Sequence, residues 1–221
     1  MKALLIKFNC NMESITTFWI IRLINTVFIA AFIVMIDRQP ADSEAKVHPF
    51  AYANFHEVTP GVLYRSKQLT AEQFDRFIRK YGIKTVINLR GTSLQAKWYR
   101  KEMAAVAKDS IIHYDVPLSS TRYVPSRVLD SLMSLFGQSP EPILVHCQAG
   151  ADRTGLFCAA WKLKIEEVSP EEASKQLSIV YGHFPLFNST RAMDSSFHDY
   201  ARFLGYTTIK AHGKSTWIRN H

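Results

Sequence analysis

The stretch Pro142–Gly155 reads PILVHCQAGADRTG and decides the fold of this chain. Its opening residues, PILV, are apolar and are typical of a short buried strand. A loop with a glycine follows at once, and a helical pattern begins at Thr154. A strand, a tight loop and a helix in this order predict an anion-binding loop, because the loop N–H groups and the helix N-terminus point toward one place.

Two side chains of this loop, Cys147 and Arg153, stand with five residues between them. The converging N–H groups favour the thiolate form of Cys147. The planar guanidinium of Arg153 can bind two phosphoryl oxygens, a task that Lys performs poorly. Thr154 can donate its hydroxyl to the departing sulfur. This arrangement suits attack of sulfur on a phosphate monoester, which gives a cysteinyl-phosphate that water then hydrolyses.

At these residues the sequence resembles the cysteine-dependent protein tyrosine phosphatase superfamily, whose signature is HC-x5-R-[ST]. The string His146–Gly155 is most similar to a bacterial group with HC-x-A-G-x-D-R-T-G, which includes tyrosine and phosphoinositide phosphatases. The resemblance extends over Val47–Gly205 and is to a compact dual-specificity or bacterial-type phosphatase. Besides Cys147, Arg153 and Thr154, it implies that the substrate phosphate is bound by the remaining loop residues, His146, Gln148, Ala149, Gly150 and Ala151.

The general acid is less clearly indicated than the nucleophile. Protonation of the leaving group needs a carboxylic acid, and most of the superfamily supplies an Asp from a loop that here, at Ser119–Tyr123, contains no carboxylate. Asp152 is the better candidate, since the resembling bacterial group and myotubularin-like lipid phosphatases carry an Asp at this place. Asp115, within a predicted strand, is the second candidate. Each candidate also has a non-catalytic alternative. Asp152 could stabilise the loop by accepting hydrogen bonds from backbone N–H groups, and Asp115 could be an ordinary polar residue at the end of a strand.

The substrate is predicted to be a phosphorylated protein, with a phospholipid headgroup as the alternative. Phosphoinositide-preferring relatives often carry a basic residue where this chain has Ala151. Arg90 can reach the site, because α/β sheets bind ligands at the C-terminal ends of their strands. The turn Tyr181–Pro185 either lines the pocket or packs as a corner. The other basic residues near these motifs are more typical of a solvated face: Arg65, Lys67, Lys97, Arg100, Lys101 and Arg122.

We therefore expect a protein phosphatase of the tyrosine or dual-specificity type. A lipid phosphatase acting on phosphoinositides or phosphatidylglycerophosphate is the alternative. A silent phosphate-binding module or a rhodanese-like sulfurtransferase is more remote, because Cys147, Arg153 and the preceding His146 are all present. No cofactor and no metal are expected.

The composition agrees with an ordinary folded chain. The 221 residues are 47% hydrophobic and 21% charged, which excludes collagen-like, low-complexity and wholly disordered sequences. Three cysteines are too few for a disulfide scaffold, and Cys158 is expected to be a packed small hydrophobe. The net charge of +8 favours an anionic partner. No nucleic-acid recognition motif is present, so nucleic acid is not expected as a partner.

Strand and helix patterns alternate along the chain. They predict an α/β domain in which a mainly parallel sheet is flanked by helices on both faces. The expected strands are 62–64, 84–89, 111–118 and 142–145. The expected helices are 70–81, 92–108, 126–136, 154–164, 170–181 and 191–204, the first with a capping box formed by Thr70 and Gln73.

The N-terminal part has a different character. Residues 18–36 are apolar enough to form a membrane-spanning signal-anchor or signal peptide, preceded by the tail 1–17 and followed by the linker 37–48. Basic residues before the segment favour a cytoplasmic N-terminus and an extracytoplasmic catalytic domain, secreted if the signal is cleaved. Met12 is an alternative start. The phosphatase domain is expected at 49–206, followed by a basic tail at 207–221.

Overall fold

The structure is a computed structural model that describes residues 53–108, 110–184, 191–211 and 214–220. The chain divides into two compact units, Met1–Val47 and His48–His221, and the described residues all belong to the second. The predicted membrane segment at 18–36 and the linker at 37–48 lie outside the described residues. Across the described ranges, no helix combines the length and apolarity that a bilayer crossing requires.

Five short strands form the central sheet. They are β1 (His56–Thr59), β2 (Leu63–Ser66), β3 (Thr85–Asn88), β4 (Ile112–Asp115) and β5 (Ile143–His146), in the order β1-β2-β5-β3-β4. β1 is antiparallel to β2, and the other three pairings are parallel. The predicted α/β fold with a mainly parallel sheet is therefore confirmed, whereas β1 was not predicted.

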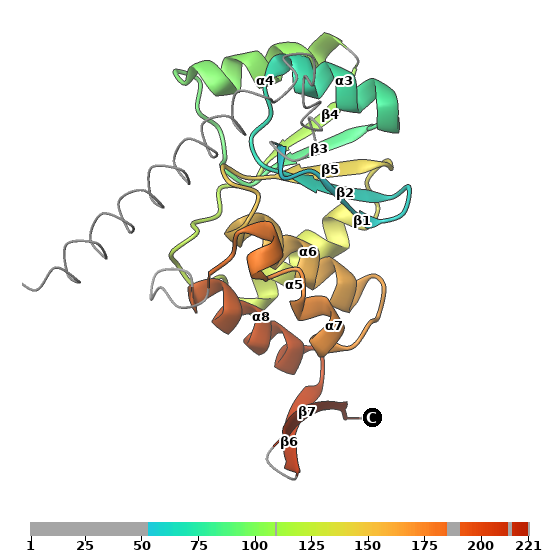
Figure 1. Cartoon of the computed structure of the whole chain (residues 1–221), viewed down its shortest axis with the longest axis vertical. Helices are drawn as coiled ribbons and strands as arrows, with labels where there is room; N and C mark the ends of the chain where they lie inside the picture. Colours follow the sequence, from blue (N-terminus) through green and yellow to red (C-terminus); the bar gives the residue numbers. More distant parts are fainter. Residues whose placement is uncertain (1–52, 109, 185–190, 212–213, 221) are drawn as a thin grey trace, which may run out of the picture. The chain divides into compact units, whose positions relative to one another are not determined.

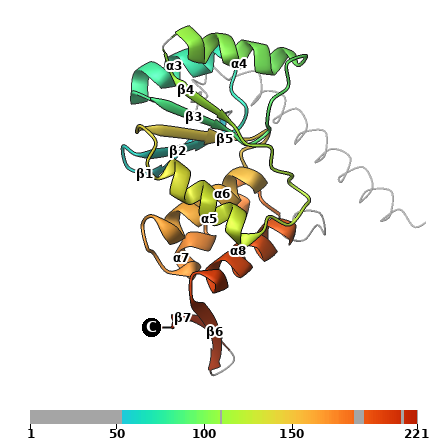
Figure 2. The same ribbon diagram turned by 180° about the vertical axis from the view of Figure 1, so that it is seen from behind.

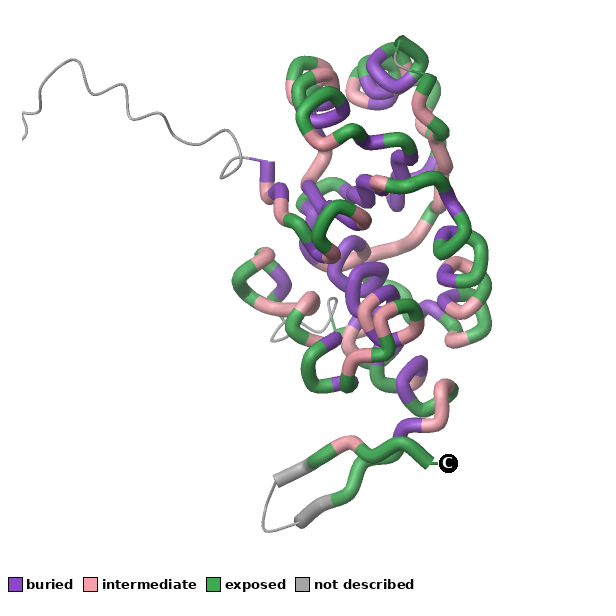
Figure 3. The backbone as a smooth tube through the Cα atoms, turned by 90° about the vertical axis from the view of Figure 1, so that its right-hand side faces the viewer, coloured by how far each residue is buried: buried purple, intermediate pink, exposed green. Residues whose placement is uncertain are grey.

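The helices cover both faces of the sheet. α3 (Ala71–Tyr81) and α4 (Lys97–Lys108) lie on one face, and α5 (Ser126–Phe136), α6 (Asp152–Lys164), α7 (Pro170–Ser174) and α8 (Arg191–Phe203) lie on the other (Figures 1 and 2). Each face has its own cluster of buried apolar side chains. Buried positions follow the strands and the central helix α6 (Figure 3). Cys158, predicted to be a packed hydrophobe, is fully buried in α6.

Local sequence explains where α3 begins and ends. The Thr70 side chain accepts a hydrogen bond from the Gln73 N–H, and the Gln73 side chain bonds the Thr70 backbone, which completes the predicted capping box. Gly82 ends the helix with φ +64°, in the left-handed region. The prediction for this helix is confirmed.

Two predicted helices are shorter than expected. α4 begins at Lys97 rather than directly after a cap at Thr92 or Ser93, and the Thr92 hydroxyl instead donates to Asp115. α7 ends at Ser174 and is followed by the 3₁₀ turn η1 (Ile179–Tyr181). Arg65 donates hydrogen bonds to the backbone and side-chain oxygens of Gln176. The Gln176 carbonyl therefore bonds Arg65, whereas in a longer α7 it would accept a hydrogen bond from the next turn of the helix.

The segment expected as a basic C-terminal tail contains two strands. β6 (Tyr206–Ala211) and β7 (Lys214–Arg219) pair as an antiparallel hairpin. The hairpin contacts the helical layer through the Trp217 N–H, which donates to Glu171 at 2.8 Å, and through the Trp217 ring, which stacks on His198. The tail prediction was therefore wrong: β-branched and aromatic residues are frequent on both sides of Gly213, at 206–209 and 216–218, which is a hairpin signal that the net basic charge of the segment obscured.

Candidate active site

The parallel register places four strand ends at one edge of the sheet. His146 at the end of β5 lies between Ser66 of β2 and Asn88 of β3, and Asn88 in turn lies opposite Asp115 of β4. The chain segments that leave these strands therefore meet around the loop that follows β5. This is the edge at which parallel α/β sheets bind ligands.

The loop Cys147–Ala151 is fixed from outside through its carbonyl groups. Four carbonyls of the loop and of the residue before it accept hydrogen bonds from other segments: His146 from the Leu89 N–H (2.8 Å), Gln148 from the Gln68 N–H (3.1 Å), Ala149 from Asn54 Nδ2 (3.0 Å) and Gly150 from Arg65 Nη2 (2.8 Å). With these carbonyls turned outward, the loop N–H groups can face its interior. The Gly150 N–H does so and donates to Cys147 Sγ at 3.3 Å.

Cys147 is the first residue of this loop and is 2% exposed. α6 begins at Asp152, so the positive end of its dipole adjoins the loop. The hydroxyl of Thr154 is buried and has no hydrogen-bond partner within the described part of the chain. A buried hydroxyl without a partner is rare, and it is available to a ligand or to the sulfur.

Arg153 is anchored on one side only. Its Nη1 donates to the carbonyls of Leu89 and Leu118, each at 3.3 Å. Its Nε is buried and, among the described residues, has no partner. The segments after β3 and β4 thus hold Arg153 by its Nη1, and its Nε remains buried without an acceptor among the described residues. An anion in the loop would supply that acceptor.

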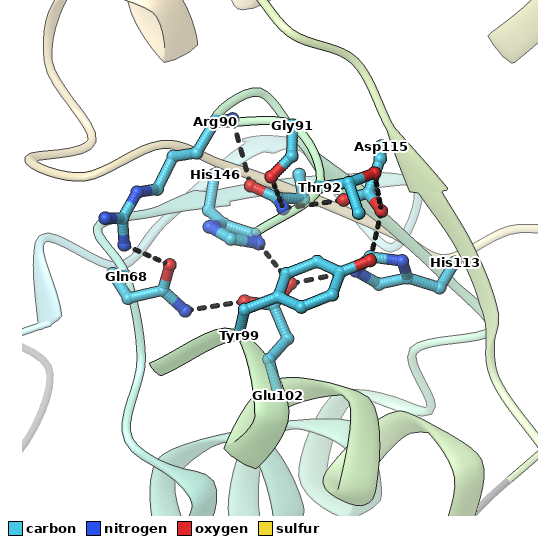
Figure 4. Close-up of polar contacts among 10 residues, drawn as sticks. Gln68, Arg90, Gly91, Thr92, Tyr99, Glu102, His113, Asp115 and His146 are labelled. Carbon is cyan, nitrogen blue, oxygen red and sulfur yellow. Dashed lines mark hydrogen bonds and ion pairs between the residues drawn. The ribbon is translucent and has the colours of Figure 1, made fainter. Parts of the chain in front are cut away.

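His146 is held by a buried carboxylate that the sequence analysis did not identify. Glu102 of α4 accepts from His146 Nε2 at 2.8 Å, from His113 Nε2 at 2.9 Å and from Gln68 Nε2 at 2.6 Å (Figure 4). Burial acts to raise the pKa of Glu102, but His146 and the three hydrogen bonds outweigh it and lower this pKa to about 2. Glu102 is therefore an ionised anchor for His146, the residue that precedes Cys147.

Arg90 lies beside the loop and turns toward α4. Its Nη1 donates to Gln68 at 2.8 Å (Figure 4). Its guanidinium carbon lies 3.4 Å from the centre of the Trp98 ring. Burial and the positive charge of Arg153 lower the pKa of Arg90. Arg90 thus joins the loop to a groove of about 420 Å³ whose lining is both basic and apolar: Gln68, Leu69, Thr70, Lys97, Trp98 and Lys101.

The two candidate acids lie in different surroundings. Asp115 accepts hydrogen bonds from Asn88 at 2.7 Å, from Thr92 at 3.0 Å and from the Tyr99 hydroxyl, so it connects β4 to β3 and to the segment around α4 (Figure 4). Asp152 is the first residue of α6. Its Oδ1 lies 2.7 Å from His183 Nδ1, and its side chain remains 22% exposed.

Several supporting residues were missed or misjudged in the sequence analysis. Arg65, counted there with a solvated basic face, is fully buried behind the loop. Asn54, Glu102 and His183 were not singled out, although the turn that contains His183 was noted as a possible pocket wall. A buried histidine needs an acceptor, but no local pattern indicates that Glu102 of α4 supplies it.

The fold and the loop Cys147–Ala151 place this chain among the families of cysteine-dependent phosphatases. Residues 48–194, more than half of the chain, match a family described as "DSP-PTPase phosphatase fused to NAD+ Kinase". The chain belongs to this DSP-PTPase family, and the predicted resemblance to the tyrosine phosphatase superfamily is confirmed.

Solved structures with the same fold agree. The chain is similar to P. aeruginosa TpbA in complex with pTyr, at 21% identity and a TM-score of 0.54, covering 74% of this chain and 98% of that one. Tk-PTP in its active form is 15% identical, with a TM-score of 0.53 and coverage of 67% and 97%. The Siw14 catalytic core is 20% identical, with a TM-score of 0.52 and coverage of 65% and 83%.

Proposed function

We propose that this chain hydrolyses phosphate monoesters through a cysteinyl-phosphate on Cys147, and that its substrates are phosphorylated proteins. The observation that carries the proposal is the loop itself: its carbonyls are held outward, its Gly150 N–H lies on the sulfur, and the buried Nε of Arg153 has no partner among the described residues. Such a loop binds a phosphoryl group better than a neutral ligand. The pTyr complex of TpbA, which shares the fold, supports a phosphoprotein substrate.

In the first step, the Cys147 thiolate attacks phosphorus while Arg153 binds two non-bridging oxygens. The S–P bond forms, the P–O bond to the leaving group breaks, and Asp152 donates a proton to the departing oxygen. In the second step, water attacks phosphorus, Asp152 takes a proton from it, and the S–P bond breaks. Thr154 hydrogen-bonds the sulfur as it leaves as a thiolate. Asp152 is favoured over Asp115 because it adjoins Arg153 and, among the described residues, only its Oδ1 has a hydrogen-bond partner, whereas three donors surround Asp115.

The test is phosphate release by the purified full chain, with Cys147→Ser as the matched control. The panel contains a phosphotyrosine peptide, a phosphoserine peptide, a phosphoinositide and phosphatidylglycerophosphate. We expect the phosphotyrosine peptide to be hydrolysed fastest and Cys147→Ser to abolish release from every substrate. If no substrate releases phosphate in a Cys147-dependent manner, a silent phosphate-binding module or a sulfurtransferase would replace the proposal.

A second candidate function, a lipid or headgroup phosphatase, is favoured by the groove beside Arg90. Lys97 and Lys101 lie one helical turn apart and are both exposed, so they place two like charges on one helix face. A headgroup with a further phosphate could interact with them. Under this alternative, Lys97→Gln with Lys101→Gln would raise KM for the phosphoinositide several-fold, while KM for the phosphotyrosine peptide would stay unchanged.

A further inference from the structure

The turn Ile179–His183 is packed against the back of the phosphate-binding loop. Asn54 Nδ2 donates one hydrogen bond to the Tyr181 carbonyl and one to a loop carbonyl, each at 3.0 Å. The guanidinium of Arg65 lies 3.8 Å from the centre of the Tyr181 ring and also donates to a loop carbonyl. Loop and turn therefore share two of their supporting side chains.

A third connection places a histidine between two carboxylates. His183 Nδ1 lies 2.7 Å from Asp152 Oδ1, and its Nε2 lies 3.2 Å from Asp194 Oδ2 on α8. The ring is fully buried, while the Asp152 and Asp194 side chains are 22% and 30% exposed. Because both ring nitrogens face acceptors, both can carry hydrogen only in the charged imidazolium. Burial opposes that charge, but the two carboxylates outweigh it and raise the pKa of His183 to about 9.

We propose that His183, supported by Asp194, is a positioning residue that fixes the Asp152 carboxyl group for proton transfer at the reacting phosphorus. The inference rests on the proposed function and gives the two oxygens of the Asp152 carboxyl group different roles. His183 holds Oδ1, and Oδ2 carries the proton that passes to the leaving group. When that proton has left, the imidazolium stabilises the new carboxylate, which then takes a proton from the attacking water.

The experiment compares His183→Leu and His183→Asn in the full chain on two substrates. One is an aryl phosphate, whose leaving group departs with little need of a proton, and the other is an alkyl phosphate, which depends on proton donation. We expect His183→Leu to lower kcat for the alkyl phosphate by about tenfold to a hundredfold, and for the aryl phosphate by no more than about threefold. His183→Asn, which can still donate to Asp152, should recover part of the loss. The exposed His198→Leu should change neither substrate.

Two further measurements separate positioning from a structural role. In an Asp152→Asn background, His183→Leu should add little to the loss, since the group that it positions is gone. The proposal would be overturned if His183→Leu lowered kcat equally for both substrates, or if its loss added fully to that of Asp152→Asn. Nitrogen NMR of the His183 ring needs no turnover. The ring should titrate with a pKa of about 9, and Asp194→Asn should lower this pKa. An ordinary titration near pH 6.5 would refute the positioning role, whereas absence of Cys147-dependent hydrolysis would refute the proposed function alone.

Discussion

Gly150 combines two constraints at a single residue of the loop Cys147–Ala151. Its φ is +73°, and a Cβ built there would lie 2.7 Å from backbone atoms of Ser66 and Lys67. Gly61 has a similar φ of +71° with no atom within 4 Å, so it is a matched control for backbone strain alone. We expect Gly61→Ala to cost about 1 kcal/mol of unfolding free energy with unchanged activity. Gly150→Ala should also displace the loop and lower kcat/KM by at least tenfold.

The check is urea unfolding and phosphate release for both variants. Full activity in Gly150→Ala would show that the loop does not need this close approach.

The loop that contains Gly150 also illustrates what can be predicted from a sequence. The six signature positions lie within ten consecutive residues, so a local pattern is enough to single out Cys147 and Arg153. The partners that hold the loop carbonyls, Asn54 and Arg65, are 95 and 85 residues away from them, and no local pattern connects such positions.

At the scale of secondary structure, one buried carboxylate of α4 connects this helix to two strands of the sheet. Glu102 is 1% exposed and bonds His113 of β4 and His146 of β5. Glu102→Leu leaves both histidines without this acceptor and should cost about 3 to 5 kcal/mol of unfolding free energy at pH 7. Glu102→Gln keeps an acceptor oxygen and should cost less. Denaturant unfolding measures both, and the exposed Glu172→Gln should stay within about 1 kcal/mol of wild type.

An effect of Glu102→Leu no larger than that of Glu172→Gln would contradict this role.

The helices and strands themselves were largely predictable, because capping residues and apolar spacing act locally: α3, α5 and α8 follow their predicted bounds closely. Where a tertiary contact competes with the local pattern, the prediction failed. Thr92 bonds Asp115 instead of opening a helix, and Gln176 bonds Arg65 instead of extending one.

At the scale of the whole described domain, two charged clusters lie on opposite faces of the sheet and respond to opposite ends of the pH scale. Glu102, on the α4 side, has a folded-state pKa lowered to about 2 from the ordinary 4.5. Its contribution to stability is therefore present above pH 4.5 and is lost as pH falls toward 2. His183, on the α8 side, has a folded-state pKa raised to about 9 from 6.5. Its contribution is present below pH 6.5 and is lost as pH rises toward 9.

These two groups together predict that unfolding free energy, as a function of pH, is highest between about 4.5 and 6.5 and falls on both sides. Glu102→Gln should flatten the acid side and leave the alkaline side unchanged, while His183→Asn should do the reverse. Because the two clusters share no partner, the double variant should lose both slopes additively. Urea unfolding of the full chain from pH 3 to pH 10 tests this with phosphate release as a parallel readout. A His183→Asn variant that keeps the alkaline slope would mean that another group, and not the imidazolium between Asp152 and Asp194, responds to pH there.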